Sequence, residues 1–156
     1  MASTFSVEVE LKSSAQKIWE SINDLPNFAP KAFPRVFDSI VALEGDGNSA
    51  GTVRTIKYAQ GSPIASVTEK LDVVDNEKKI ISYTFTDGDI FKFYKSFKAT
   101  VVVSPLQKDN GALMKYSGEF ERVKEAIVLP ESIEEFLAFS LRHLDDHLLQ
   151  QNKIMA

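Results

Sequence analysis

The chain has 156 residues, of which 44% are hydrophobic and 26% charged, so we expect one globular domain over residues 1–156. A formal net charge of −4 argues against a broad basic surface for nucleic acid, and the absence of cysteine excludes disulfides, metal thiolates and cysteine nucleophiles. The sequence shows neither a basic-then-apolar leader nor an apolar run of ~20 residues. We therefore expect a cytoplasmic protein without a membrane span.

Residues 4–11 open the chain with strict alternation of apolar and polar side chains, which predicts a half-buried strand. Ser13 then stands three residues before Gln16, which is the spacing of a capping box. Apolar residues follow at helical spacing. We expect a short helix that begins after Ser13 and ends near Asn23.

A second short helix is expected from about Asp24, because Pro26 suits a first helical turn and two later prolines limit growth. The segment 35–120 then reads as one strand after another. The six strands expected there cover residues 36–43, 53–58, 64–74, 81–86, 91–104 and 114–121. Residues 87–88 (Asp-Gly) and 110–111 (Asn-Gly) are hairpin signals, so the sheet should be antiparallel.

A last helix of ~20 residues is predicted from Pro130 onward, long enough to cross the domain. Its apolar stripe consists of Ile133, Phe136, Leu137, Ser140, Leu141, Leu144 and Leu148. Its opposite, solvated side is expected to hold Glu131, Glu134, Glu135, Arg142, Asp145 and Asp146. One strand, two short helices, six strands and one long helix together indicate an α+β fold with a curved antiparallel sheet.

Several hydroxyl groups fall on faces that are otherwise apolar. They belong to Tyr58, Ser66, Tyr83, Tyr116 and Ser140. A buried hydroxyl needs a hydrogen-bond partner, which a ligand or a trapped water could supply. Filled cores are the norm, so without further information the pattern favours a packed interior.

The glycine-rich segment matches two catalytic patterns. Residues 47–51 fit G-x-S-x-G, and residues 45–50 fit G-x-G-x-x-A. Both patterns need a helix immediately afterwards, whereas residues 52–58 alternate as a strand. Asp46 would also repel a phosphate. The segment is interpreted as a hairpin loop rather than a catalytic or nucleotide-binding one.

His143 and His147 share one side of the last helix, but Leu144 stands where an H-E-x-x-H zinc motif has glutamate. No third ligand is indicated, so no metal is expected. His147 lies beside the apolar stripe, either at a cavity border or at the core edge. Residues 91–98 interleave aromatic side chains with lysines, which single-stranded nucleic acid binders also do. The net charge favours a strand with a solvated lysine face instead, and no nucleic-acid partner is expected.

Six segments, in this order and spacing, resemble the major latex protein branch of the plant pathogenesis-related class 10 and birch pollen allergen superfamily. They are residues 24–26 (Asp-Leu-Pro), 30–34, 43–47, 58–63, 87–89 and 94–100. The resemblance covers nearly the whole chain. It implies the helix-grip fold, in which a seven-stranded curved antiparallel sheet surrounds the long C-terminal helix and two short helices follow the first strand.

The resemblance further implies an internal cavity that binds apolar or amphipathic small molecules, such as sterols, terpenoids, flavonoids, fatty acids or hormone-like compounds, in plant defence or specialised metabolism. By family analogy the cavity walls are Phe37, Ile56, Tyr58, Ile64, Ser66, Ile81, Tyr83, Phe85, Phe97, Ala99, Tyr116, Gly118, Phe136, Leu137, Ser140 and Leu144. The alternation of apolar residues selects the same faces.

Some relatives are enzymes, so the alternative is a cofactor-free cyclase or isomerase acting on a reactive terpenoid or alkaloid intermediate in the same cavity. The candidate catalytic residues are Tyr58, Tyr83, Tyr116, Ser140 and His147. Strand parity turns Arg54 and Lys95 inward as well, near strand ends. A third interpretation is a signalling module whose loops engage a protein partner, a phosphatase or receptor, once ligand is bound.

Overall fold

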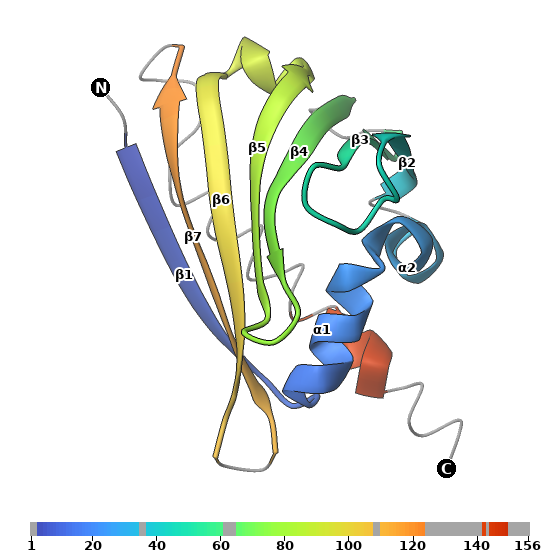
Figure 1. The fold of residues 1–156 in the computed structure, drawn as a ribbon, viewed down its shortest axis with the longest axis vertical. Helices are drawn as coiled ribbons and strands as arrows, with labels where there is room; N and C mark the ends of the chain where they lie inside the picture. Colours follow the sequence, from blue (N-terminus) through green and yellow to red (C-terminus); the bar gives the residue numbers. More distant parts are fainter. Residues whose placement is uncertain are drawn as a thin grey trace.

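The computed structural model describes residues 3–34, 37–60, 65–107, 110–123, 142 and 144–149. Within these residues, seven strands form one antiparallel sheet in the order β1-β7-β6-β5-β4-β3-β2 (Figure 1). The strands are β1 (Ser3–Leu11), β2 (Phe37–Glu44), β3 (Val53–Tyr58), β4 (Ser66–Asp75), β5 (Ile80–Gly88), β6 (Tyr94–Pro105) and β7 (Ala112–Arg122). The expected α+β fold with a seven-stranded curved sheet is confirmed.

Each strand from β2 to β7 pairs with its neighbour in sequence, and β1 closes the arrangement by pairing with β7. Two helices, α1 (Ala15–Asn23) and α2 (Leu25–Ala32), follow β1 and lie at one end of the curved sheet (Figure 1). The order of the elements thus agrees with the alternation and helical periodicity of the sequence.

The cap of α1 is Ser14, not Ser13 as the capping-box spacing predicts. The Ser14 hydroxyl accepts a hydrogen bond from the backbone N–H of Lys17, at 3.2 Å. Ser13 is buried instead: its backbone N–H donates to the Asp145 carboxylate, and its hydroxyl makes no hydrogen bond in the described part of the chain. In α2, Pro26 lies in the first turn as expected, and Pro30 is accommodated inside the helix, which ends at Ala32.

Residues 144–149 are helical and pack against α1. Leu144 and Leu148 are buried in the same core group as Ile18 and Trp19. Asp145 is only 7% exposed, so its expected place on the solvated side of the helix is wrong. It faces the loop between β1 and α1 instead. The predicted start of this helix, at Pro130, lies outside the described residues.

The connection between β5 and β6 differs from the tight hairpin that residues 87–88 predict. A short 3₁₀ helix, η1 (Asp89–Lys92), intervenes, and β6 begins only at Tyr94. Gly88 has φ +111°, and a Cβ there would lie 2.5 Å from the carbonyl oxygen of Ser66. The glycine therefore marks the close approach of β4 to this turn rather than a two-residue loop.

The buried side chains divide into two groups. The first lies between α1, residues 144–149 and the adjoining part of the sheet, and includes Ile18, Trp19, Leu71, Val103 and Met114. The second is unusually aromatic and comprises Phe5, Val67, Ile90, Tyr94, Phe97, Ala99 and Phe120. Half-buried tyrosines pack against both groups. The inner face of the sheet therefore carries a region where aromatic rings and hydroxyl groups meet.

Candidate functional site

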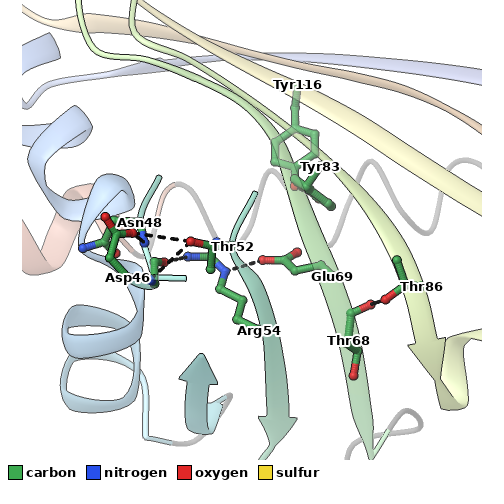
Figure 2. Close-up of polar contacts among 10 residues, drawn as sticks. Asp46, Asn48, Thr52, Arg54, Thr68, Glu69, Tyr83, Thr86 and Tyr116 are labelled. Carbon is green, nitrogen blue, oxygen red and sulfur yellow. Dashed lines mark hydrogen bonds and ion pairs between the residues drawn. The ribbon is translucent and has the colours of Figure 1, made fainter. Parts of the chain in front are cut away.

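Two tyrosines meet across β6 on the inner face of the sheet. Strand pairing sets Tyr83 opposite Ala99, and Ala99 opposite Gly118, so the row between the tyrosines carries small residues. Tyr116 reaches over them, and the two hydroxyl groups hydrogen-bond with each other (Figure 2). Burial raises the pKa of both phenols, and in Tyr83 the neighbouring Tyr116 raises it further. Both side chains thus stay neutral and able to donate or accept a hydrogen bond.

Tyr58 supplies a third phenol near the end of β3. Its ring packs against Phe37 at 5.7 Å between ring centroids, in keeping with the pairing of the two residues across β2 and β3. Burial raises the pKa of Tyr58, and the charge of Glu69 adds to the effect. Among the described residues, its hydroxyl has no hydrogen-bond partner. The side chain is only partly buried, so a ligand or a water can reach the hydroxyl.

A buried ion pair joins β3 to β4. Strand pairing sets Arg54 opposite Glu69, and Nε of Arg54 lies 2.6 Å from Oε1 of Glu69. The two side chains are only 5% and 4% exposed. The guanidinium also donates from Nη1 to the carbonyl oxygen of Gly47 at 3.1 Å, so Arg54 bridges the inner face to the glycine-rich loop (Figure 2).

Glu69 is a buried carboxyl group of this face whose pKa is shifted. Burial raises its pKa, because the charged form loses its hydration, and Arg54 opposes the rise through its charge and its hydrogen bond. Its cross-strand neighbour on β5 is Phe85, whose ring stacks on Phe97 at 5.0 Å. An ionisable group in aromatic surroundings is a common mark of a functional site.

The glycine-rich loop holds a carboxylate of its own. Asp46 accepts hydrogen bonds from the backbone N–H groups of Asn48 and Ser49, each at 2.8 Å, and from the Ser49 hydroxyl at 2.6 Å. These hydrogen bonds lower the pKa of Asp46 to about 2. The N–H groups that would cradle a phosphate are therefore occupied, and residues 52–58 continue as a strand rather than a helix. The loop supports the hairpin interpretation and not a nucleotide site.

Most of the sequence-predicted wall residues that fall in the described part of the chain share the inner face or the core group beside it. These are Phe37, Ile56, Tyr58, Ile81, Tyr83, Phe85, Phe97, Ala99, Tyr116, Gly118 and Leu144. Four others lie outside the described residues: Ile64, Phe136, Leu137 and Ser140. Gly118 sits close beneath a ring, since a Cβ added there would lie 2.6 Å from the Phe5 side chain.

Ser66 does not lie on the inner face, in contrast to the expectation from the sequence. It pairs with the exposed Lys57 and therefore belongs to the outer face of β4, whereas the buried positions of that strand are Val67, Glu69 and Leu71. With Ser66 taken as inward, Glu69 would point outward, so Glu69 is not among the residues predicted from the sequence to line the site. The alternation of Val67 and Leu71 around it was the available signal.

Lys95 does not point inward either, although strand parity predicts that it should. The pairing of β6 with β7 shifts its register between Tyr94 and Ser96, which is an irregularity of the β-bulge type. Lys95 falls at this irregularity and is exposed, not inward. Arg54, the other cation with inward parity, does point inward and is buried.

His147 lies at the core edge. Its ring contacts Phe28 at 5.6 Å and Phe33 at 6.2 Å between centroids, with near-perpendicular and tilted geometry. In the described part of the chain, no group of three or more histidine, aspartate or glutamate side chains is placed to hold a metal ion. No helix among the same residues is long and apolar enough to cross a membrane.

A seven-stranded antiparallel sheet that curls toward two short helices and a C-terminal helical segment defines the helix-grip class of fold. The chain belongs to the pathogenesis-related protein Bet v 1 family, whose family model matches residues 1–151; this family is known for ligand binding. It is 41% identical over 152 residues to MLP-like protein 423 of Arabidopsis thaliana, with 97% of each chain covered.

Two solved structures share the fold. The crystal structure of ginseng major latex-like protein 151 from Panax ginseng has a TM-score of 0.81 at 22% identity, covering 94% of this chain and 97% of that one. The structure of norcoclaurine synthase from Thalictrum flavum is less similar, with a TM-score of 0.65 at 26% identity, covering 80% of this chain and 72% of that one. The predicted kinship to major latex proteins is thereby confirmed.

Proposed function

We propose that this chain binds an apolar or amphipathic small molecule between the inner face of the sheet and the C-terminal helix, as a carrier or sink in plant defence or specialised metabolism. The observation that carries the proposal is the inner face itself, where aromatic side chains surround the hydroxyls of Tyr58, Tyr83 and Tyr116. Apolar walls supply affinity through burial, and a few polar groups orient the ligand. Membership of the Bet v 1 family supports the same conclusion.

The test is saturable uptake of a neutral apolar probe. Titrating the protein with N-phenyl-1-naphthylamine should give a fluorescence increase that saturates near one probe per chain. The variant Ala99→Phe should lose this binding, because Ala99 is one of the two small residues between Tyr83 and Tyr116. The matched control is Lys98→Phe, which adds the same ring to the neighbouring residue on the outer face.

The two variants also separate a cavity from a packed interior. If the space is open, Ala99→Phe should fold with nearly unchanged stability and fail to bind. If the space is filled, the extra ring should destabilise the fold by about 1–3 kcal/mol. The proposal fails if the unmodified protein shows no saturable uptake, or if probe binding survives in Ala99→Phe and disappears in Lys98→Phe.

A second candidate function is cofactor-free cyclisation or isomerisation of a reactive terpenoid or alkaloid intermediate. The observation that favours it is Glu69, a buried carboxyl with a raised pKa on the tyrosine-bearing face, which suits proton transfer. The structural likeness to norcoclaurine synthase points the same way. Of the sequence candidates, Tyr58, Tyr83 and Tyr116 share this face with Glu69, whereas His147 packs against Phe28 and Phe33.

The enzymatic candidate is tested by turnover with reactive terpenoid and alkaloid intermediates. Glu69→Gln, Tyr83→Phe and Tyr116→Phe should each lower the rate or change the product ratio while the variants stay folded. The candidate is rejected if the unmodified chain accelerates none of these reactions over buffer.

A further inference from the structure

The connection between β6 and β7 ends in an asparagine followed by a glycine, Asn110 and Gly111. Asn110 is exposed and has φ +54°, in the left-handed region that asparagine tolerates better than most residues. Gly111 is not among the glycines with positive φ, so the pair does not form the two-residue turn that its sequence favours. Asn110 is therefore an exposed asparagine, directly before a glycine, in a backbone conformation of low intrinsic preference.

An asparagine in front of a glycine can lose its side-chain amide without an enzyme. The backbone nitrogen of the glycine attacks Cγ of the asparagine and forms a bond to it, while the side-chain nitrogen leaves as ammonia and takes the glycine N–H proton with it. Water then opens the cyclic imide at one of its two carbonyl groups, which yields aspartate or isoaspartate. Glycine has no side chain to hinder the ring closure, and asparagine is among the thermolabile residues of proteins.

Both groups that react in this step are available in the structure. Within the described residues, the side-chain amide of Asn110 makes no hydrogen bond, and the backbone N–H of Gly111 donates none. Only the carbonyl oxygen of Gly111 is engaged, because it accepts from the backbone N–H of Leu106 at 2.9 Å. The fold therefore does not protect the amide of Asn110 by hydrogen bonding.

The other described asparagines are placed differently. Asn48 donates from its side-chain amide to the carbonyl oxygens of Gly47 and Asn23, at 3.0 and 2.9 Å. The side chains of Asn27 and Asn76 are hydrogen-bonded as well. No asparagine of the sequence other than residue 110 precedes a glycine. Sequence and structure thus single out the same residue.

Isoaspartate at residue 110 would disturb a crowded part of the fold. It lengthens the backbone by one atom directly before Gly111, where a Cβ would already lie 2.4 Å from the carbonyl oxygen of Leu11. The next residue, Ala112, is fully buried and pairs with Leu11 on β1 and Pro105 on β6. Strands β1, β6 and β7 therefore meet at this point, and β1 leads from it into α1 (Figure 1).

The same corner of the fold anchors the C-terminal helical segment, residues 144–149. Lys12 and Ser13 follow Leu11 directly, and their backbone N–H groups donate to the carboxylate of Asp145, each at 2.8 Å. A displacement of the end of β1 would draw these N–H groups away from the carboxylate. A change in the backbone at residue 110 is thus coupled to the attachment of the C-terminal segment.

We propose that Asn110 is a site of spontaneous modification, at which attack by the Gly111 nitrogen forms isoaspartate and loosens the corner where β1, β7 and residues 144–149 meet. Aspartate, the other product, keeps the normal backbone and also tolerates a positive φ, so it should disturb the fold much less. The stability of the protein would then decrease with its age. This inference does not depend on ligand binding.

The test follows the folded protein during incubation at mildly alkaline pH. Peptide mass spectrometry locates each deamidated asparagine, because a hydroxyl group replaces an amino group and the mass increases. A protein isoaspartyl methyltransferase with S-adenosylmethionine labels isoaspartate and not aspartate. The matched variants are Asn110→Gly, which accepts a positive φ and cannot deamidate, and Asn110→Asp, which carries the charge of the product on a normal backbone.

Residue 110 should deamidate several-fold faster than each of the other described asparagines, with isoaspartate as its main product. The aged protein should then unfold at a lower urea concentration, and its amide hydrogens should exchange faster at residues 11–13 and 144–149 but not at residues 53–58 of β3. Aged and fresh Asn110→Gly should have the same stability. Fresh Asn110→Asp should remain close to the unmodified chain.

Deamidation of residue 110 in urea-unfolded protein alone would mean that the fold protects the site, and the inference would be overturned. Isoaspartate at residue 110 without any loss of stability, or an equal loss in aged Asn110→Gly, would overturn it as well. Prolonged treatment of the aged protein with the methyltransferase converts isoaspartate to aspartate. It should restore most of the lost stability if the altered backbone is the cause, and a failure to do so would contradict the proposed loosening.

Discussion

The carboxylate of Asp46 organises the glycine-rich loop through hydrogen bonds. Four hydrogen-bond contacts converge on its carboxylate, from the backbone of Asn48 and Ser49 and from the hydroxyls of Ser49 and Thr52. The glycine-rich loop is thus organised around an internal anion. The carboxylate makes the turn rigid and at the same time blocks the phosphate chemistry that a glycine-rich pattern suggests.

Replacing Asp46 by Asn should lower the free energy of unfolding at neutral pH. The pKa of Asp46 falls from 3.8 to about 2 in the folded protein, so its stabilising effect is present above pH 3.8 and is lost as the pH falls through about 2. Urea unfolding of Asp46→Asn and of the unmodified chain should therefore differ at neutral pH and converge in acid. The exposed Asp38 provides a control in Asp38→Asn. A gap that stays constant across this range would contradict the assignment.

The Arg54–Glu69 pair has an asymmetric energetic role. Removing one partner leaves the other as an uncompensated buried charge, which costs about 3–5 kcal/mol, whereas replacing both with apolar residues is often neutral or better. Arg54→Met should therefore be strongly destabilising in urea unfolding, and adding Glu69→Met should recover most of the loss. Strict additivity of the two losses would show that the pair does not act as a unit.

An exposed ion pair provides a reference for the energetic effect of the buried pair. Lys98 and Glu119 face each other on the outer side of β6 and β7 at 3.5 Å, with 64% and 55% of their side chains exposed. Exposed pairs of this kind contribute about 0–1 kcal/mol. Glu119→Gln should accordingly change the free energy of unfolding by far less than Arg54→Met.

At the scale of elements, Asp145 ties the C-terminal helical segment to the start of the fold. Its two carboxylate oxygens accept the backbone N–H groups of Lys12 and Ser13, each at 2.8 Å, where β1 ends and α1 begins. Asp145→Ala should destabilise the protein by about 2–4 kcal/mol, because two N–H groups lose their partner. Hydrogen exchange should accelerate at residues 12–14 and 144–149. Asp146→Ala, at the exposed neighbour, should change neither measurement.

The elements could be predicted from the sequence where apolar and polar residues recur with a regular period. The alternation at residues 53–58 gives the bounds of β3 as observed. The prediction for Asp145 fails for a physical reason: helical periodicity separates an apolar side from a polar one, but it does not say which loop lies against the polar side. The start of β6 was missed because aromatic residues 91 and 93 also suit the η1 turn.

The tyrosine hydroxyls of the site could be predicted from the sequence, but the buried charge of Glu69 could not. Tyr58, Tyr83 and Tyr116 stand out because each interrupts an apolar face. Glu69 does not stand out, since a glutamate in a strand normally lies in water. Only the pairing of β3 with β4, which sets it opposite Arg54, makes its burial tolerable, and that register is a property of the folded sheet.

At the scale of the whole molecule, the sheet collects all four tyrosines of the chain in buried surroundings. Burial is the largest cause of a raised pKa in each of Tyr58, Tyr83, Tyr94 and Tyr116. In the unfolded chain these phenols should titrate near 10.0. Because burial in the folded protein raises the pKa of all four phenols, the stability of the fold should decrease at alkaline pH.

Alkaline titration should show this link directly. A group whose pKa is raised by folding contributes its full stability below the unfolded value of 10.0 and loses it as the pH rises further, because only the unfolded chain releases the proton easily. The native protein should show little phenolate absorbance just above pH 10, and all four phenols should then ionise together with the loss of circular dichroism. In concentrated urea the same phenols should titrate independently near 10. Gradual ionisation near 10 in the folded protein would mean that water reaches the tyrosines, and the inner face would not be the dry, aromatic site from which ligand binding is inferred.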